Sequence, residues 1–400
     1  MKPARVLVGV SFLAIAGLVL PACGGAGSGA DFGSAEGEPI KIAVIGTLES
    51  PDLSQPNSRI GAEAAAKAIN ANGGVNGRPI EVVSCNDKGD PNTAAKCARE
   101  MVGQDVVASI GSVTRNSDQA IPIFAAADIA SIGNYPATSA DRTDPSSFPL
   151  GGGITNEYTG AGYSVVKYGG AEKVSLISHS AATAQAAMGY LEKGVKAAGG
   201  EVVNEVRIDL GSADSSAQVA KAVGNGAQGV VTALPSADMG QVTRSLASTG
   251  ANLEHATDSF SAQPTLLESL GAAAEGMILS GDTPSATDTS VDYIKQFNDE
   301  MNAFDESSTR DSAGLMSWTA TYLLADVLEG LDTIDAASVL KAMGKIENKD
   351  LFWLTGFSTT APVSPAAPRI FNSTIFVNEW KDGKIILLDG PVALPAAALQ

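Results

Sequence analysis

From residue 39 onward, the sequence alternates between short apolar runs and longer segments with helical spacing. Apolar runs of strand length, bounded by Gly or Pro, indicate strands buried on both faces, as in a parallel sheet covered by helices. The alternation therefore predicts an α/β fold. In the first half it predicts strands at 40–46, 79–85, 106–111 and 130–133, and helices at 59–70, 92–102 and 118–127.

The same alternation restarts after Gly151-Gly152-Gly153, which predicts a second α/β lobe. A length of 400 residues is too great for one small domain and agrees with two lobes. Here the pattern predicts helices at 157–168, 182–198, 213–223 and 238–248, and strands at 173–178, 201–207, 229–234 and 275–280. Toward the C-terminus it predicts helices at 311–331 and 336–343, then a hairpin of strands 370–380 and 384–388 around Asp382-Gly383.

The N-terminus differs from the rest of the chain. A basic start is followed by an apolar run at 6–20 and by Leu20-Pro-Ala-Cys23. The run is shorter than the roughly 20 residues of a spanning helix and favours a signal peptide. The ending resembles a bacterial lipobox, which implies lipidation of Cys23; a plain cleaved signal and an uncleaved anchor are the alternatives. We expect a signal peptide at 1–22, a flexible Gly-rich tether at 23–38, and lipid anchoring at the extracytoplasmic face of the cell membrane.

Composition excludes several functions. The chain has 44 Asp+Glu against 26 Lys+Arg, a net charge of −18, so neither nucleic acid nor an anionic membrane surface is an expected partner. With two His and three Cys, it has few ligands for a His/Cys metal site, and we predict no metal and no cofactor. The sequence contains neither a Gly-x-Ser-x-Gly motif nor a Gly-Lys-Ser/Thr loop. The chain is therefore not predicted to be an enzyme.

Two cysteines remain after Cys23. Cys85 ends a predicted strand, and Cys97 lies on the helix that follows it. A helix packs on its own preceding strand, so the two side chains could approach each other, and an exported protein resides where disulfides persist. We expect a Cys85–Cys97 disulfide, with two free buried thiols as the alternative.

Several segments resemble those of one protein family. The resemblance extends over about residues 39–390, and the family is the Leu/Ile/Val-binding type of periplasmic solute-binding protein, which serves ABC importers. The segments are Gly46-Thr-Leu-Glu-Ser-Pro51, Ile69-Asn-Ala-Asn-Gly-Gly-Val-Asn-Gly77, Asp87-Lys-Gly-Asp-Pro91, Ile110-Gly-Ser-Val113, Lys196-Ala-Ala-Gly-Gly-Glu201 and Ala273-Ala-Glu-Gly-Met277.

This resemblance implies a type I periplasmic-binding-protein fold, in which two lobes with parallel sheets flanked by helices are joined by three hinge crossings. Lobe 1 would comprise 39–153 and 283–361, and lobe 2 would comprise 154–282 and 362–400. The resemblance also implies a monomer that captures a small amino acid, carboxylate or amide and docks on an ABC permease. A ligand-sensing lipoprotein partner of a membrane receptor is the alternative function. The ligand would lie beyond the carboxyl ends of the strands.

In lobe 1, the family holds an amino acid with a serine after the third strand and a small-Ala-Thr loop after the fourth. Thr138 matches the family threonine, whereas Arg115 stands at the family serine and Pro136 lacks the N–H of a small residue. Arg115 would bind a carboxylate or another anion as a bidentate donor, or else is a solvated arginine at a helix start. Thr138 would contact the ligand or cap a helix. The candidate ligand residues of lobe 1 are Gln55, Arg115, Asn116, Asn134, Pro136, Ala137 and Thr138.

In lobe 2, the family places an aromatic residue after one strand and an acid after the next. The first of these loops carries Ser236 and no aromatic residue. The acidic position falls on Ser259, with Asp258 beside it. We predict that Ser236, Asp258 and Ser259 contact the ligand, Asp258 as an ammonium partner or, alternatively, as a turn or cap residue. The polar loop around His179 could also line the cleft.

Overall fold

The computed structural model describes residues 34–50, 54–181 and 184–399. The predicted signal peptide and Cys23 lie outside these residues, as does most of the predicted tether. Within the described ranges, no helix has the length and apolarity that crossing a membrane requires.

The first lobe is built on a five-stranded parallel sheet with the order β2-β1-β3-β4-β5. Its strands are β1 (Ile40–Gly46), β2 (Ile80–Asn86), β3 (Ala108–Ile110), β4 (Ala130–Ile132) and β5 (Ser147–Phe148). The predicted strands are confirmed, except that β5 was not predicted because it has only two residues. A parallel sheet buries both faces, which explains why β1 and β4 consist of almost wholly apolar side chains.

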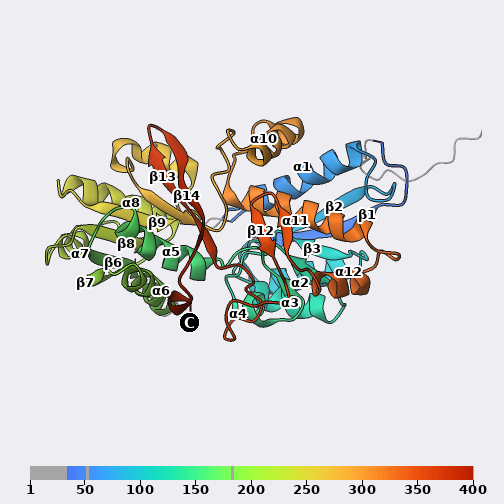
Figure 1. The fold of residues 1–400 in the computed structure, drawn as a ribbon, viewed down its shortest axis with the longest axis horizontal. Helices are drawn as coiled ribbons and strands as arrows, with labels where there is room; N and C mark the ends of the chain where they lie inside the picture. The colour runs from blue at the N-terminus through green and yellow to red at the C-terminus, as the bar shows by residue number, and fades with distance from the viewer. Residues whose placement is uncertain (1–33, 51–53, 182–183, 400) are drawn as a thin grey trace, which may run out of the picture. The chain divides into compact units, whose positions relative to one another are not determined.

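Helices from distant parts of the sequence cover this sheet. Side chains of α2 and α3 pack on one face, and those of α1, α10, α11 and α12 contribute to the core on the other. Figure 1 shows α1 beside α10 and α11, with which it is in contact although more than 200 residues separate them. The bounds are α1 (Asn57–Ala71), α2 (Pro91–Val102), α3 (Ser117–Ala125), α10 (Asp292–Asp305), α11 (Ser312–Glu329) and α12 (Ala336–Met343), with the short α4 (Ser139–Thr143), β11 (Lys349–Leu351) and β12 (Leu354–Phe357) beside them.

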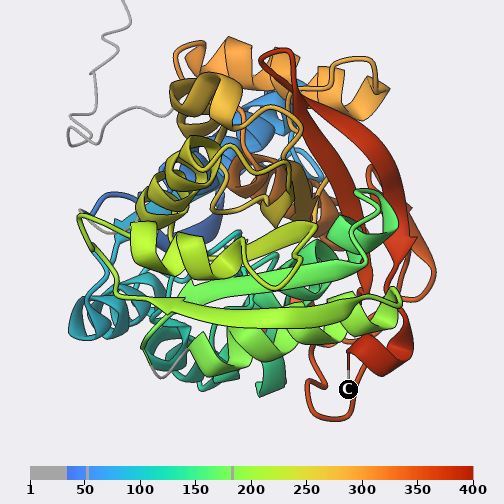
Figure 2. The ribbon, with the colours of Figure 1, turned by 90° about the vertical axis from the view of Figure 1, so that its left-hand side faces the viewer.

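The second lobe contains a seven-stranded sheet with the order β14-β13-β10-β9-β8-β6-β7. Helices lie on both sides of it, and the β13–β14 hairpin forms one edge (Figure 2). Strands β6 to β10 are parallel, whereas β13 and β14 are antiparallel additions. The strands are β6 (Lys173–His179), β7 (Glu201–Ile208), β8 (Gly229–Ala233), β9 (Glu254–Asp258), β10 (Ile278–Gly281), β13 (Thr374–Lys381) and β14 (Lys384–Ala393). The helices are α5 (Ile154–Lys167), α6 (Ala184–Ala197), α7 (Ser216–Ala222), α8 (Ser236–Ser248) and α9 (Pro264–Leu270), with short turns η1 (Gly271–Ala273) and η2 (Ala396–Ala398).

The sequence pattern did not predict β5, α4, α9, β11 or β12, nor the two elements β9 and α10. Strand β9 carries Glu254, His255 and Asp258, so it lacks an apolar run, and it is a strand because β8 and β10 flank it. Helix α10 has only a narrow apolar face, formed by Ile294, Phe297 and Met301. The turn of the predicted hairpin is confirmed, because Asp382 and Gly383 both have positive φ, as a type I′ turn requires. Strands β10 and β13 begin several residues later than predicted.

Within the described residues, the chain passes between the two sheets three times. The crossings lie at 149–153, between β5 and α5; at 282–291, between β10 and α10; and at 358–373, between β12 and β13. Gly153 in the first crossing has a φ of 57°, and a Cβ at this position would lie 2.6 Å from Pro136 Cγ. Glycine is therefore required where the first crossing passes the loop that follows β4.

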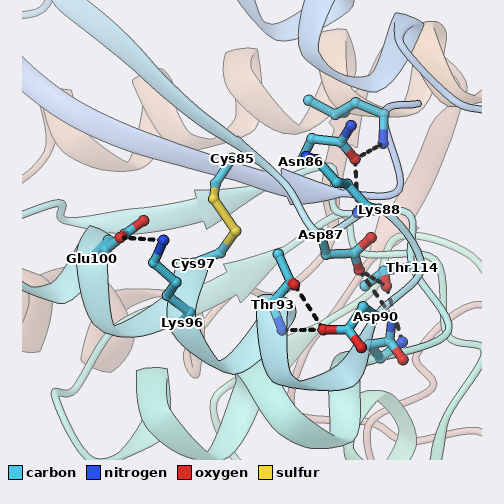
Figure 3. The surroundings of a disulfide bond; sticks show 12 residues. Cys85, Asn86, Asp87, Lys88, Asp90, Thr93, Lys96, Cys97, Glu100 and Thr114 are labelled. Carbon is cyan, nitrogen blue, oxygen red and sulfur yellow. Dashed lines mark hydrogen bonds and ion pairs between the residues drawn. A yellow bond between two sulfur atoms is a disulfide. The ribbon is translucent and has the colours of Figure 1, made fainter. Parts of the chain in front are cut away.

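Cys85 and Cys97 form a disulfide, as predicted. Cys85 lies on β2 and Cys97 on α2, with 5.7 Å between their Cα atoms (Figure 3). The bond therefore joins the strand to the helix that packs on it. Asp90 begins this helix by accepting a 2.7 Å hydrogen bond from the Thr93 backbone N–H, and Pro91 occupies its first turn, where its missing N–H is not needed.

Candidate functional site

The carboxyl ends of β1, β2, β3 and β4 lie along one edge of the first sheet, and a buried aspartate that follows β2 joins the loops after β1 and β3. Asp87 accepts a 2.8 Å bond from the Thr47 hydroxyl after β1. It also accepts bonds from the Thr114 hydroxyl and from Asn116 Nδ2, both after β3, the second at 3.3 Å. The Gly89 N–H donates to it at 2.8 Å. Figure 3 shows Asp87 and Thr114 turned toward each other. Asp87 therefore positions the loop that carries Arg115.

Three predicted ligand residues of lobe 1 are engaged by the protein itself. The Asn116 amide donates to Asp87, and its N–H donates to Thr114 Oγ1 at 2.9 Å. Asn134 Nδ2 donates to Asp141 Oδ1 at 2.7 Å and to Ser147 Oγ at 3.1 Å. Gln55 is buried, and its carbonyl accepts from the Ser58 hydroxyl at the start of α1. These contacts hold the loops in place.

Thr138 is the N-cap of α4. Its N–H and hydroxyl both donate to Asp141 Oδ2, at 2.8 and 2.9 Å, in a capping box. The guanidinium of Arg142 donates to the carbonyls of Pro136 and Ala137, at 3.4 and 3.1 Å. Burial raises the pKa of Asp141, while the hydrogen bonds from Thr138 and Asn134 act in the opposite direction. The loop Pro136-Ala137-Thr138 is therefore held by α4, and the Thr138 hydroxyl is already bound to Asp141.

Arg115 has an exposed side chain at the end of the positioned loop, and it approaches the second lobe. Burial raises the pKa of Tyr158, in α5, well above its usual range, and the charge of Arg115 opposes this shift. Burial also lowers the pKa of His179, at the end of β6, and Arg115 lowers it further. His179 Nδ1 is buried without a hydrogen-bond partner among the described residues. Arg115 therefore lies within electrostatic range of two lobe 2 side chains.

An aromatic contact connects the two lobes near this point. The ring of Tyr135, in the loop after β4, stacks on Phe260, in the loop after β9, with centroids 4.6 Å apart and an interplanar angle of 18°. The Tyr135 hydroxyl donates to Glu157 Oε2 at 2.8 Å. Tyr135, Glu157 and Phe260 carry no sequence signal of a ligand site, except that Tyr135 lies between the predicted ligand residues Asn134 and Pro136.

Three buried carboxyl groups lie near this aromatic pair. Asp258 follows β9 and accepts from the Ser261 N–H at 2.7 Å, and burial raises its pKa to about 6. Asp282 accepts from the N–H groups of Gly152 and Gly153, at 3.2 and 2.6 Å, and burial raises its pKa to about 7. Burial, together with the charges of Asp282 and Asp258, raises the pKa of Glu157 well above its usual range. Asp258, the acid predicted to contact the ligand, therefore lies close to two other buried carboxyl groups, those of Glu157 and Asp282.

The two remaining lobe 2 candidates follow β8 and β9. Ser236 is the first residue of α8, after Pro235 at its N-cap. The Ser259 hydroxyl is buried without a partner among the described residues and lines a separate cavity. The described parts of the chain contain no cluster of His, Cys, Asp and Glu side chains suited to a metal ion.

The arrangement defines a class of protein: two α/β lobes connected by several crossings, with a cation of one lobe near Tyr158 and His179 of the other, beside which lie buried acids. Such a site can bind a small molecule that carries both an anionic and a cationic group. It contains no assembled nucleophile and base.

Comparison with known proteins identifies the family. Residues 39–373 match the family model described as periplasmic binding protein, and the chain belongs to this family. Curated relatives include the Leu/Ile/Val-binding protein of Escherichia coli K12, 25% identical over 319 residues, with 76% of this chain and 83% of that protein covered. Another is the Leu/Ile/Val/Thr-binding protein of Salmonella typhimurium, 25% identical over 306 residues, with 74% and 80% covered. The chain is thus a distant relative of these binding proteins, and the family is one of binding proteins rather than enzymes.

Solved structures share the fold. The branched-chain amino acid transporter substrate-binding protein from Streptococcus pneumoniae, in complex with isoleucine, superposes with a TM-score of 0.73 at 18% identity, covering 88% of this chain and all of that one. A leucine-binding protein from Thermotoga maritima gives a TM-score of 0.70 at 18% identity, covering 88% of this chain and 98% of that one. The predicted type I periplasmic-binding-protein fold is confirmed.

Proposed function

We propose that this protein is the substrate-binding component of an ABC importer of the branched-chain amino acid type, and that it captures a small amino-acid-like solute between its lobes. The observation that carries the proposal is the position of Arg115 within electrostatic range of Tyr158 and His179, with the buried acid Asp258 close to Tyr158. A solute with a carboxylate and an ammonium group would satisfy both sides of this arrangement. The names of the curated relatives support the class of ligand.

In this proposal Arg115 binds the carboxylate. Its guanidinium offers paired donors, which suit a planar carboxylate. It stands on a loop that Asp87 holds rigidly, so little conformational entropy is lost when the solute binds. Thr138, Pro136 and Ala137 would contribute backbone and hydroxyl groups beside it, and Asn116, Asn134 and Gln55 would act mainly by holding these loops.

Asp258 binds the ammonium group in this proposal. A buried carboxyl group with a raised pKa gains a counter-ion when an ammonium group arrives, and its ionised form is then favoured. Ser236 and Ser259 flank this position on the loops after β8 and β9. Because the solute would contact both lobes, its binding favours the closed arrangement about the crossings.

The proposal extends to the whole chain. Lobe 1 comprises 39–153 and 283–361, and lobe 2 comprises 154–282 and 362–400. Residues 1–22 are a signal peptide, and Cys23 carries a lipid that holds a monomeric protein at the extracytoplasmic face of the membrane, where it delivers its solute to the permease. A Cys23→Ser variant would then appear in the soluble fraction after cell fractionation.

The test of the ligand site is Arg115→Ala, measured by calorimetry with a solute first identified by thermal-shift screening of amino acids, small carboxylates and amides. We expect the affinity to fall by roughly 10- to 100-fold, as for the loss of a charge-assisted hydrogen-bonded pair. The control is Arg99→Ala, the same change at an exposed position on α2, which should leave affinity unchanged. Unchanged affinity in Arg115→Ala would show that the proposed carboxylate partner is wrong.

The alternative is a sensing lipoprotein that delivers its liganded form to a membrane receptor. The two functions differ in the membrane partner. Stimulation of permease ATPase activity by the liganded protein, in vesicles containing the permease encoded beside it, supports import. Absence of stimulation by a correctly liganded protein favours sensing.

A further inference from the structure

One side chain of the first lobe is bound to the second lobe in two ways. The ring of Tyr135, in the loop after β4, stacks on Phe260 with centroids 4.6 Å apart, and its hydroxyl donates to Glu157 Oε2 at 2.8 Å. Pro136, the next residue, lies so close to Gly153 of the first crossing that a Cβ there would be 2.6 Å from Pro136 Cγ. The loop after β4 therefore contacts both the second lobe and the first crossing. We call Tyr135, Phe260 and Glu157 the interlobe latch.

Glu157 lies where the segments that join the lobes meet. It is in the first turn of α5, directly after the first crossing. Its carboxyl group accepts a hydrogen bond from the backbone N–H of Asp282, in the second crossing. The Asp282 carboxylate in turn accepts from the N–H groups of residues 152–153, in the first crossing. Asn156, the residue before Glu157, donates to the Asn372 carbonyl of the third crossing at 2.9 Å. Glu157 is thus linked, by hydrogen bonds or by its neighbour in the chain, to all three crossings.

The surroundings of Glu157 favour its neutral form. Glu157 is 2% exposed, and the carboxyl groups of Asp258 and Asp282 are buried close to it. None of the ion pairs found among the described residues includes one of these three groups. Hydrogen bonds from Tyr135 and from the Asp282 N–H favour the ionised form. Burial and the two negative charges act more strongly, and they raise the pKa of Glu157 well above its usual range.

The titratable groups around Glu157 come from several elements. They are Tyr135 from the loop after β4, Tyr158 from α5, Asp258 from the end of β9 and Asp282 from the second crossing. Arg115 is the cation that acts on this group of residues, through Tyr158, and its exposed side chain is screened by water. The charges that shift the pKa of Glu157 itself are those of the acids.

Movement of the lobes away from each other would withdraw Tyr135 from Glu157 and admit water to the carboxyl group. A glutamate in water ionises at about pH 4. The closed arrangement, in which the latch is formed as in this structure, therefore retains a proton that the open arrangement releases. This linkage favours the closed arrangement fully below about pH 4, and the advantage is lost as the pH rises through the raised pKa of Glu157.

We propose that the interlobe latch is a proton-dependent switch, which keeps the lobes closed while Glu157 is neutral and lets them open when Glu157 ionises. The inference goes beyond the proposed function, because the switch operates without a solute and does not depend on which solute binds. An extracytoplasmic binding protein is exposed directly to the pH outside the cytoplasm. That pH therefore sets the fraction of closed protein, and acid slows the escape of any molecule held between the lobes.

The experiment is small-angle X-ray scattering of the full-length protein without solute, with the radius of gyration measured from about pH 4 to pH 9. A Cys23→Ser background keeps lipid out of the sample. Circular dichroism at each pH distinguishes lobe opening, which preserves secondary structure, from unfolding. We expect the radius of gyration to rise with pH while the circular dichroism stays constant. A constant radius, or a rise accompanied by loss of secondary structure, overturns the inference and leaves the proposed capture of a solute standing.

Glu157→Gln tests which group carries the proton. Glutamine keeps an oxygen that can accept from Tyr135 but cannot ionise, so this variant should stay closed at the pH values at which the unmodified protein opens. The control is Glu172→Gln, the same change at an exposed position before β6 in the same lobe, which should open as the unmodified protein does. Opening of Glu157→Gln at the same pH as the unmodified protein contradicts the switch.

Tyr135→Phe tests the contact from the other lobe and keeps the ring that stacks on Phe260. Loss of one hydrogen bond should lower the ratio of closed to open protein roughly fivefold. Because one proton changes this ratio tenfold per pH unit, opening should occur about 0.7 pH unit lower. The control is Tyr168→Phe, which removes a hydroxyl that donates to Asp389 at 2.8 Å within the second lobe. Equal shifts in both variants, or no shift in Tyr135→Phe, contradict a latch between the lobes.

Discussion

The loops of lobe 1 and the groups around the second crossing differ in how their polar side chains are partnered. In lobe 1, Asn116 and Thr138 are bound by Asp87 and Asp141. Near the second crossing, the oxygens of Ser259, Thr283 and Asn378 are buried without partners among the described residues. Lobe 1 is therefore organised before a solute arrives, whereas the other side keeps unused hydrogen-bonding capacity.

This difference suggests a division of roles. Pre-organised loops bind the group that all amino acids share, because a fixed geometry suits a constant feature of the solute. The oxygens near the second crossing lack such hydrogen bonds among the described residues. Lobe 1 has unpartnered oxygens of its own, Ser131 Oγ and Asn134 Oδ1, but they line a small cavity between its sheet and α3.

The largest effect is expected from breaking the organisation of lobe 1 at Asp87. In Asp87→Ala, the hydroxyls of Thr47 and Thr114, the Asn116 amide and the Gly89 N–H all lose their acceptor. Water can satisfy the exposed Gly89 N–H. At somewhat more than about 1 kcal/mol for each of the three buried unmet donors, the free energy of unfolding should fall by about 4 kcal/mol. Urea denaturation measures this change.

The control for Asp87 is the nearby Asp90→Ala, which removes an exposed cap that binds only Thr93. It should destabilise the protein less and leave solute affinity unchanged. A similar loss of stability in both variants would mean that Asp87 does not organise the loops.

The disulfide provides a second test within lobe 1. Replacing both Cys85 and Cys97 with Ser removes a cross-link between residues 12 positions apart, and the loop-entropy relation gives a loss of about 3 kcal/mol. Chemical denaturation of the variant, compared with that of the unmodified protein under non-reducing conditions, measures the loss. Detection of two free thiols by mass spectrometry of the unmodified protein would contradict the bond itself.

The buried acids between the lobes predict a dependence of stability on pH. The pKa of Asp258 is raised to about 6 and that of Asp282 to about 7, so the folded protein holds protons that the unfolded chain has released. Their contribution to stability is complete below about pH 4, the carboxyl value of the unfolded chain, and is lost as the pH rises through 6 and 7. The slope is about 1.4 kcal/mol per pH unit for each such proton.

Asp282→Asn removes one of these protons and should flatten the decline in the free energy of unfolding between pH 4 and 7. Denaturation curves at several pH values test this, with Asp335→Asn, at the exposed start of α12, as the control that leaves the decline in place. An unchanged slope in Asp282→Asn would show that its carboxyl group is already ionised in the folded protein at pH 4.

The smallest effects come from a pair of hydroxyl truncations that compare the two regions directly. Thr138→Ala removes a partnered capping hydroxyl and should cost about 1 kcal/mol of stability. Ser259→Ala removes an unpartnered hydroxyl and should change stability by less than about 0.5 kcal/mol. Thermal denaturation of the two variants measures both changes, and equal losses would remove the contrast between the regions.

Solute affinity adds a second measurement to this pair. If Thr138 acts only as a cap, Thr138→Ser should preserve both stability and affinity. A loss of affinity in Thr138→Ser at unchanged stability would indicate that the threonine methyl group contacts the solute.

Much of the fold could be predicted from the sequence because its signals are local. The apolar runs of β1, β2 and β6 and the Asp-Pro start of α2 each lie within a few consecutive residues. The turn Asp382-Gly383 and the pairing of Cys85 with Cys97 rest on equally short stretches. Strand β9 could not be predicted in this way, because it has no apolar run and is a strand only because β8 and β10 flank it.

The sequence by itself determined two α/β lobes and the loops that carry Arg115, Thr138 and Asp258, because strand ends and family motifs are properties of short segments. Only the tertiary structure decided that Tyr135 stacks on Phe260 and that Asp87 binds two separate loops. It also decided that Ser259, Thr283 and Asn378, which lie far apart in the sequence, line one cavity. Such contacts depend on how strands are ordered across a sheet and where the chain crosses between lobes, and no local pattern encodes either.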